Sequence, residues 1–129
     1  MYTILICGDR NWSDFTKIRE VLLKVIGTRS LQEVEVVHGG ARGADSIGGW
    51  IAKDIGIPTI HVHPADWEKH GKAAGPIRNE LMLQKHDVDI VLAFHSNIEE
   101  SKGTKHMISC AKKKNIPVIL TTPPGSPHP

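Results

Sequence analysis

Five short runs rich in β-branched residues alternate with longer amphipathic stretches along this chain of 129 residues. The runs occupy residues 2–7, 33–38, 58–63, 88–94 and 117–121. Such alternation is typical of consecutive βαβ units with a parallel sheet, and right-handed crossovers place the intervening helices on both faces. The sequence therefore predicts a three-layer α/β/α Rossmann-like domain with a mainly parallel five-stranded sheet.

Four amphipathic stretches between the runs indicate helices at residues 13–26, 44–55, 76–85 and 104–114. Capping residues agree with these limits. Ser13 is a suitable N-cap, Gly27 and Gly56 follow the first two helices, and Pro76 suits a first helical turn. We expect one domain, residues 1–121, followed by a disordered proline-rich tail, residues 122–129.

The composition and charge of the chain exclude several classes of protein. With 40% hydrophobic and 23% charged residues it is neither disordered nor collagen-like, and a net charge of +2 does not indicate a dedicated duplex-DNA binder. No apolar stretch approaches the roughly 18 residues that span a bilayer, and the short apolar start resembles a strand more than a signal peptide. We expect a cytoplasmic protein without a membrane partner, in which Cys7 and Cys110 are buried free thiols.

Three of the predicted strand-to-helix turns carry glycine. They are Gly8-Asp9-Arg10, residues 39–45 and Lys102-Gly103-Thr104. In α/β folds ligands bind beyond the carboxyl ends of the strands, where glycine admits a close approach and a helix N-terminus attracts phosphate. Glycine is also common in such turns for conformational reasons alone. Because three such turns lie at the same edge of the predicted sheet, with Arg10, Arg42 and Arg78 nearby, we expect an anionic, nucleotide-like small molecule as the ligand.

The candidate ligand-binding residues lie in these turns and on the third predicted helix. They are Gly8, Asp9, Arg10, Gly39, Gly40, Arg42, Gly43, Asp45, Arg78, Asn79, Gly103 and Thr104. Arg78 is placed to meet a phosphate bidentately. Asp45 has two open roles, a cap on its helix or a contact with ribose hydroxyls. Gly48 and Gly49 inside the same helix indicate close packing by either a strand or a ligand.

Two common nucleotide-binding motifs are absent from the chain. The stretch 39–43 is neither G-x-G-x-x-G nor a P-loop, and His38 stands where an NAD dehydrogenase would carry an acidic residue. We therefore expect neither hydride transfer nor NTP hydrolysis, and no cofactor. The residues His38, His61, His63 and His70 suggest a metal, but no carboxylate or cysteine stands beside them at metal-binding spacing, so we predict no metal site.

Four segments of the chain are similar to one known family. Residues 4–14, 38–52, 64–82 and 93–104 resemble the YspA-like branch of the SLOG superfamily, Rossmann-like domains related to the LOG phosphoribohydrolases. The resemblance implies a bacterial or phage protein that binds nucleotides or nucleotide-derived molecules, and relatives commonly form homo-oligomers. Within the long loop, Trp67 either stacks on a base or packs the loop onto the domain.

The LOG relatives hydrolyse the N-glycosidic bond of nucleoside monophosphates. Their motif pairs an arginine and a nearby methionine with a P-G-G-x-G-T-x-x-E segment, and Arg78 and Met82 fit its first half, which makes Arg78 the catalytic candidate. The second half does not fit, because Met107 stands where the glutamate is expected and a thioether cannot stabilise an oxocarbenium ion. The acidic residues that could substitute are Glu99, Glu100, Asp9 and Asp45.

Three functions are therefore open. The first is binding of a nucleotide or ADP-ribose-like ligand, as a sensor, carrier or sponge. The second is a nucleoside-monophosphate N-glycoside hydrolase with a relocated carboxylate. The third is binding of single-stranded DNA, for which Lys102 and Lys105 would add charge, although few aromatic residues are available for base stacking. We expect a small-molecule partner rather than a nucleic acid.

Overall fold

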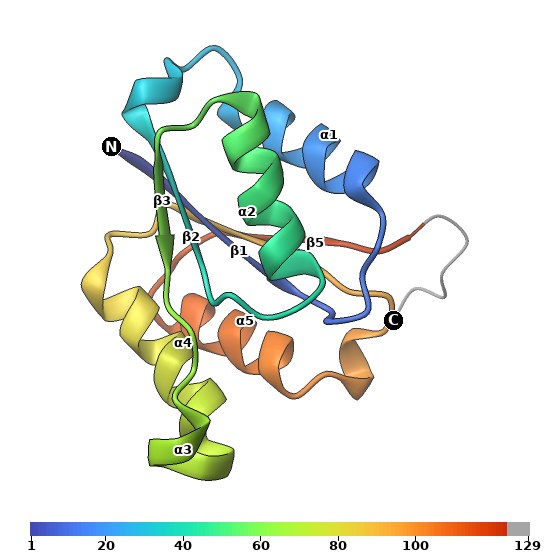
Figure 1. The fold of residues 1–129 in the computed structure, drawn as a ribbon, viewed down its shortest axis with the longest axis vertical. Helices are drawn as coiled ribbons and strands as arrows, with labels where there is room; N and C mark the ends of the chain where they lie inside the picture. Colours follow the sequence, from blue (N-terminus) through green and yellow to red (C-terminus); the bar gives the residue numbers. More distant parts are fainter. Residues whose placement is uncertain (124–129) are drawn as a thin grey trace.

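Five parallel strands form the sheet at the centre of the molecule (Figure 1). The computed structural model describes residues 1–123. The strands are β1 (Tyr2–Gly8), β2 (Val34–His38), β3 (Thr59–Val62), β4 (Ile90–Phe94) and β5 (Val118–Thr121), in the order β3-β2-β1-β4-β5. The chain starts in the middle of the sheet, builds one half, and then crosses to build the other. Because β1 pairs with both β2 and β4, the strand order reverses there, which is where open α/β sheets form a crevice.

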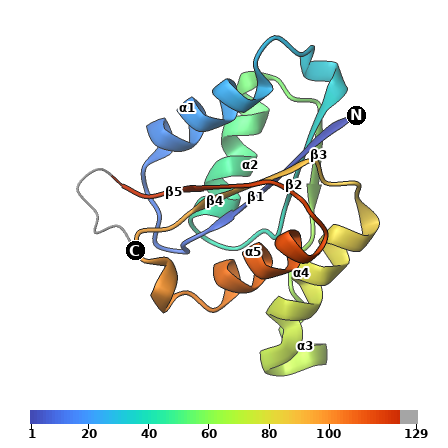
Figure 2. The same ribbon diagram turned by 180° about the vertical axis from the view of Figure 1, so that it is seen from behind.

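Helices cover both faces of the sheet, as the sequence predicts. Helices α1 (Phe15–Ile26) and α2 (Ala44–Ile55) lie on one face, and α4 (Ala74–Lys85) and α5 (Gly103–Lys113) on the other, as Figure 2 shows. A short helix, α3 (Trp67–His70), precedes α4. Single 3-10 turns complete the fold at η1 (Leu31–Glu33), η2 (Gly71–Ala73) and η3 (Ile98–Glu100). The three-layer α/β/α prediction is confirmed.

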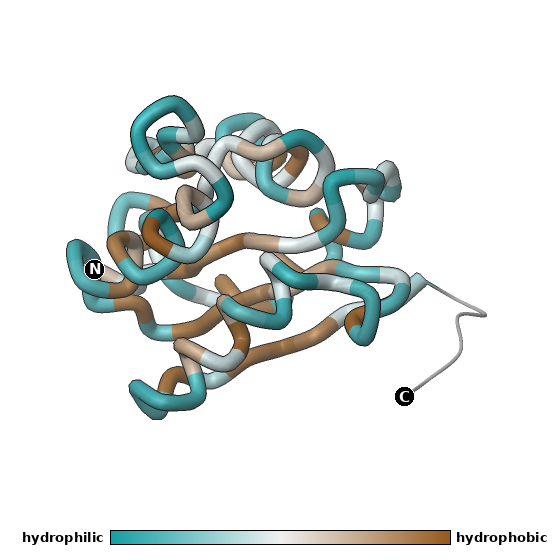
Figure 3. Tube along the Cα trace, turned by 90° about the horizontal axis from the view of Figure 1, so that it is seen from below, coloured by the Kyte–Doolittle hydropathy of each residue, from teal (hydrophilic) through white to brown (hydrophobic). Residues whose placement is uncertain are grey.

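The core has two halves because successive strand residues point to opposite faces of the sheet. On β1, Ile4 and Ile6 pack with α1 and α2, whereas Leu5 and Cys7 pack with α4 and α5. Phe94 at the end of β4 is fully buried, and its ring meets the Trp12 ring edge-on at 5.6 Å. Figure 3 shows hydrophobic segments through the middle of the molecule and hydrophilic ones mostly around it.

Several predicted boundaries shift by one or two residues. Helix α1 begins at Phe15 because Asp14, not Ser13, is the N-cap, and its carboxylate accepts a hydrogen bond from the Lys17 amide at 3.0 Å. Helix α4 begins at Ala74 rather than residue 76, which moves Arg78 from the first turn of the helix to the second. The predicted stops at Gly27 and Gly56 are the observed C-caps.

The two glycines inside α2 are explained by the sheet beneath them. A β-carbon at Gly48 would lie 2.7 Å from the Ile6 side chain, and one at Gly49 would overlap the His38 ring. Of the two open interpretations, close packing by strands is therefore the one observed.

Part of the predicted tail, residues 124–129, lies outside the described residues. Within residues 1–123, none of the helices has the length and apolar character that crossing a bilayer requires.

Candidate functional site

A cleft of about 830 Å³ opens at the carboxyl ends of the strands. Its walls come from the turns after β1 and β2, the segment after β3, helix α4, the loop after β4 and the start of α5. Of the residues predicted to contact a ligand, Arg42 and Gly43 do not line this cleft, and all the others do. The fold therefore brings the predicted turns together at one place.

The turn after β1 forms the floor of the cleft. Gly8 has a φ of +153°, and a β-carbon there would overlap the carbonyl of Phe94 on the neighbouring strand. The Asp9 amide donates to that same carbonyl at 2.8 Å, and the Asp9 carbonyl accepts from the Ala44 amide at 3.1 Å. The Asp9 carboxylate accepts from the Ser96 hydroxyl at 3.2 Å. Asp9 therefore ties β1 to the loop after β4 and to the start of α2.

The backbone amides of the turn after β2 donate hydrogen bonds to side chains of the protein itself. The Gly39 amide donates to the Asp45 carboxylate at 3.0 Å, and the Gly40 amide donates to His38 Nδ1 at 3.0 Å. Asp45 is 5% exposed, and burial raises the pKa of its carboxyl to about 6, although the Arg78 charge and the Gly39 amide oppose the shift. We expected these amides to face a phosphate, but in this conformation Asp45 and His38 occupy them. The predicted cap on the helix is wrong, because Gly43 is the N-cap of α2 and has no side-chain cap, while the Asp45 carboxylate holds the turn before the helix. The contact with ribose hydroxyls stays a prediction.

Arg78 also makes its bonds within the protein. Its Nη1 donates to the Gly39 carbonyl at 2.7 Å and to the His63 carbonyl at 3.5 Å, and its Nε donates to Asn79 Oδ1 at 3.1 Å. A β-carbon at Gly39 would overlap the guanidinium, which explains the glycine at this position. Arg78 therefore clamps the turn after β2 and the end of β3 onto α4, while still lining the cleft.

The start of α5 is an open, polar part of the cleft. The Thr104 amide is capped by the Ser101 hydroxyl at 3.0 Å, and Asn79 donates to the Gly103 carbonyl at 3.2 Å. A β-carbon at Gly103 would meet nothing within 4 Å. Lys102 is exposed here, and Arg10 is exposed on the opposite turn. A helix N-terminus in a cleft that is also lined by an exposed lysine and an exposed arginine is a favourable place for an anion.

Arg42 and Gly43 have structural positions outside the cleft. Arg42 is exposed, and its Nη2 lies 3.4 Å from Asn11 Oδ1. Gly43 is the N-cap of α2 with a φ of +83°, and a β-carbon there would overlap the backbone of Asp9. These two residues shape the turn rather than line the cleft, so their predicted ligand contacts have no support from the geometry.

Comparison with known sequences agrees with this architecture. The sequence pattern of the YspA, cpYpsA-related SLOG family matches residues 2–70, from β1 through α3. The Gene 61 protein of Mycobacterium phage D29 is 42% identical over 123 residues, which cover 92% of this chain and 95% of that protein. The chain belongs to the YspA, cpYpsA-related SLOG family. The predicted resemblance is confirmed, and the SLOG pattern itself contains the turns after β1 and β2.

The acidic residues of this SLOG domain differ in their access to the cleft. Asp9, Asp45 and Glu100 line it, whereas Glu99 is exposed, does not line it and pairs with Lys105 at 3.4 Å. Met107, which stands where LOG relatives carry a glutamate, is fully buried between α5 and the sheet. A carboxylate for chemistry would therefore have to come from the turn after β1, from Asp45 or from Glu100. The cleft is also lined by three basic residues, Arg10, Arg78 and Lys102, so its acidic and basic side chains balance in number.

Sequence reasoning missed some lining residues of the SLOG cleft. His95, Ser96 and Asn97 line it, and their position directly after the fourth predicted strand is the signal that was available. Cys7 also lines it, and burial raises the pKa of its thiol, so the sulfur stays protonated at neutral pH. Trp67 is 61% exposed at the cleft, and a β-carbon at Gly75 of α4 would lie 3.7 Å from its ring. Stacking on a base stays a prediction.

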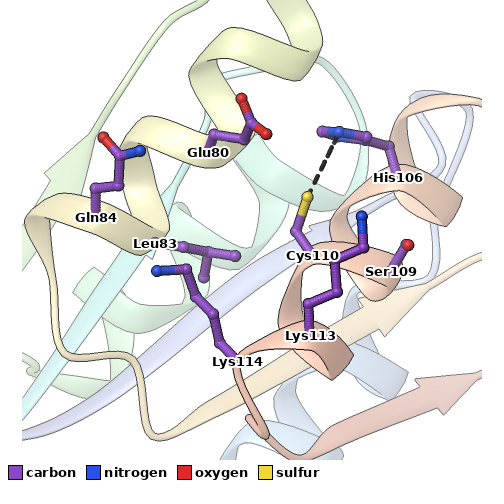
Figure 4. A pocket seen from close by; sticks show the side chains of 8 residues that line it. All are labelled: Glu80, Leu83, Gln84, His106, Ser109, Cys110, Lys113 and Lys114. Atoms are coloured by element: carbon purple, nitrogen blue, oxygen red, sulfur yellow. Dashed lines mark hydrogen bonds between the residues drawn. The ribbon is translucent and has the colours of Figure 1, made fainter.

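A second pocket of about 170 Å³ lies between α4 and α5 of the SLOG domain (Figure 4). His106 and Cys110 point toward each other there, with the sulfur 3.4 Å from Nε2. Both predicted free thiols are confirmed, although Cys110 is only partly buried. Because ligand sites for drug-sized molecules span about 300–1,000 Å³, this pocket is too small for a nucleotide.

Proposed function

We propose that this SLOG domain binds a nucleotide or nucleotide-derived molecule, of the ADP-ribose type, in the cleft at the strand ends. The observation that carries the proposal is the cleft itself, about 830 Å³ at the point where the strand order reverses. That volume suits a mononucleotide or a dinucleotide-sized ligand, and the place is where α/β sheets bind such ligands. The domain would serve as a sensor, carrier or sponge for its ligand.

Different residues of the cleft lining suit the phosphate, the ribose and the base of such a ligand. A phosphate fits the start of α5, where Lys102 is exposed and the helix dipole is favourable, and Arg10 on the turn after β1 adds a second positive charge to the same cleft. Ribose hydroxyls fit the Asp9 carboxylate, and a base fits the exposed face of Trp67. A cytoplasmic location suits both the ligand and the two free thiols.

Isothermal titration calorimetry with AMP, ADP-ribose and adenosine tests this proposal. We expect saturable binding of the phosphorylated ligands and weaker binding of adenosine. Lys102→Ala should weaken AMP binding by about 10-fold to 150-fold, since a charge-assisted hydrogen bond contributes about 1.5–3 kcal/mol. The matched control is Lys112→Ala, which removes an exposed lysine from the far end of the same helix. Absence of binding by every phosphorylated ligand, or an equal effect of both substitutions, contradicts the proposal.

A second candidate function, hydrolysis of the N-glycosidic bond of a nucleoside monophosphate, rests on the three carboxylates that line the cleft. Of these, Asp45 has a pKa near 6, which suits an acid or base at neutral pH. Incubation with AMP, CMP and NAD followed by chromatography tests it. Free base that disappears in Asp9→Asn, Asp45→Asn or Glu100→Gln supports a relocated carboxylate, whereas saturable binding without base release contradicts hydrolysis and supports binding alone. The balanced charge of the cleft offers no support for single-stranded DNA as the ligand.

A further inference from the structure

Four side chains with metal-binding donors meet at the β3 edge of the sheet, apart from the cleft lining. Glu35 lies on β2, His61 on β3, His63 directly after β3, and His86 directly after α4. Val37 is the register partner of His61 and packs in the core beneath α4 and α5. Because residues two apart share a face, Glu35, His61 and His63 all lie on that face of the sheet.

The donor atoms of this group are close together. His61 Nε2 lies 3.1 Å from Glu35 Oε2, and His63 Nε2 lies 2.8 Å from His86 Nε2. The His61 and His86 rings are 4.6 Å apart between centroids. One donor atom from each of Glu35, His61 and His86 falls within 4.8 Å of the others. In a tetrahedral zinc site with bonds of about 2.0–2.1 Å, neighbouring donors lie about 3.3 Å apart. Side-chain rotations that shift these donor atoms by up to about 1.5 Å would therefore bring Glu35, His61 and His86 to the spacing of a zinc site.

We propose that Glu35, His61 and His86 bind one divalent transition-metal ion of the zinc class, and that His63, whose Nε2 lies 2.8 Å from His86 Nε2, becomes the fourth ligand after a side-chain rotation. Imidazole nitrogens with one carboxylate are a donor set that zinc uses in proteins, and imidazole selects zinc over magnesium or calcium. The ion joins β2, β3 and the end of α4 at the edge of the sheet.

The neighbours of this group hold it in a binding arrangement. The Thr3 hydroxyl donates to Glu35 Oε1 at 2.7 Å, which fixes the carboxylate and leaves Oε2 facing His61. Such outer hydrogen bonds orient metal ligands and raise their affinity. The His63 amide donates to the His38 carbonyl at 2.9 Å, so the backbone that carries the third ligand stays attached to β2.

The protonation of the group also suits a cation. Burial lowers the pKa of His63 and of His86, and the histidines lower each other further. Burial alone would raise the pKa of Glu35, but the hydrogen bonds from Thr3 and His61 bring it below its ordinary value. At neutral pH these three residues are therefore in the deprotonated forms that bind metal. In the metal-free protein one of the two Nε2 atoms of His63 and His86 donates its hydrogen to the other. For both Nε2 atoms to bind an ion, that ring must change tautomer, so that its proton lies on Nδ1 and both rings stay neutral.

This inference reverses a prediction from the sequence. We predicted no metal because no carboxylate stood beside His61 and His63 along the chain, whereas Glu35 reaches His61 from the neighbouring strand. A second group of donors, Glu80, His106 and Cys110, also lies within 4.8 Å. Burial raises the pKa of the Cys110 thiol, which works against the thiolate that a metal needs.

The test is titration of tag-free protein, stripped with a chelator, with ZnCl₂ by calorimetry and with CoCl₂ by visible absorption. We expect one ion per chain, a cobalt spectrum typical of nitrogen and oxygen ligands, and a higher unfolding temperature with zinc. His61→Ala/His86→Ala should lower zinc affinity by more than about 100-fold, because loss of outer hydrogen bonds alone costs about 10–100-fold. His106→Ala/Cys110→Ser is the matched control, and it should bind zinc like the wild type.

Two results overturn the proposal: no zinc binding by the wild type, or equal zinc affinity of the wild type and the His61→Ala/His86→Ala variant. If that variant does not fold, Glu35→Gln serves instead, since it keeps a group that bonds to Thr3 and removes only the charge. Circular dichroism of each apo protein establishes folding before titration. Nucleotide is absent throughout, so failure here leaves the proposed nucleotide binding untouched, and the reverse also holds.

Discussion

At the scale of single residues, the site is held by groups that bond to each other before any ligand arrives. Arg78 and Asp45 are the clearest cases, because the sequence made both of them candidates for ligand contact. The structure places the Arg78 guanidinium on two backbone carbonyls and the Asp45 carboxylate on the Gly39 amide. Both also line the cleft, so a substitution at either position changes the fold and the site together.

Asp45 makes the stability of the fold depend on pH. Burial raises the pKa of its carboxyl from 3.8 to about 6. Between these values the folded protein keeps a proton that the unfolded chain releases, so this group lowers the free energy of unfolding as pH rises through the window. A shift of this size corresponds to about 3 kcal/mol at most. The Asp45→Asn variant has no carboxyl to titrate at this position, so this decrease in the free energy of unfolding is absent. Relative to the wild type, its free energy of unfolding should rise by up to about 3 kcal/mol between about pH 4 and pH 7.

Urea denaturation at several pH values measures this difference. The quantity of interest is the wild-type free energy of unfolding minus that of Asp45→Asn, because the other titrating groups cancel in it. Two parallel curves across the whole range would show that the Asp45 carboxyl titrates normally in the folded protein.

We expect different roles for the two arginines of the cleft: Arg78 stabilises the fold as well as the site, whereas Arg10 contacts the ligand alone. Arg78→Ala removes bonds to Gly39, His63 and Asn79, and we expect it to destabilise the fold by about 1–3 kcal/mol as well as to weaken nucleotide binding. Arg10→Ala removes an exposed side chain, so stability should change by less than about 0.5 kcal/mol while AMP affinity falls. Thermal unfolding and calorimetry on both variants measure the two effects. Unchanged AMP affinity in Arg10→Ala would remove Arg10 from the phosphate site.

At the scale of helices and strands, the sequence predicts nearly all of the fold. All five strands and the four long helices are where hydrophobic periodicity and the capping residues place them, to within about two residues. Helix α3 is not predicted, because four residues are too few for a helical period, although Asp66 caps it through a hydrogen bond from the Lys69 amide at 3.1 Å. Contacts between strands, such as that of Glu35 with His61, cannot be predicted without the strand order and register.

The helical glycines provide a prediction at this scale. Gly49→Ala puts a methyl group into the His38 ring and should destabilise the protein by about 1–3 kcal/mol despite the better helix propensity of alanine. Gly103→Ala meets no atom within 4 Å and should be neutral or stabilising by up to about 1 kcal/mol. Denaturant unfolding of the two variants measures the contrast. A stable Gly49→Ala variant would mean that the His38 ring moves aside without cost.

Gly103→Ala also reports on the ligand. Its new methyl group stands at the open start of α5, where we place the phosphate, so AMP affinity should fall even though the fold is intact. Calorimetry on this variant, with Lys112→Ala as the neutral reference, measures the effect. Undiminished affinity would place the phosphate elsewhere in the cleft.

At the scale of the whole molecule, the cleft follows from topology more than from any motif. The strand order β3-β2-β1-β4-β5 gathers turns that are far apart in the sequence at one edge of the sheet, and their place can be predicted once the strands are known. The hydrogen bonds within the cleft cannot be predicted in the same way, because they depend on which side chains of the folded protein lie within bonding distance of each backbone amide. Asp45 at Gly39 and His38 at Gly40 are the two examples.

His63 takes part in both regions of the molecule at once. Its ring belongs to the group at the β3 edge, and its carbonyl accepts a bond from Arg78 in the wall of the cleft. If the proposed zinc ion fixes the His63 ring, it also restricts the backbone carbonyl of His63, to which Arg78 donates. Thermodynamic linkage makes any such effect reciprocal: whatever factor the metal applies to nucleotide affinity, the nucleotide must apply to metal affinity.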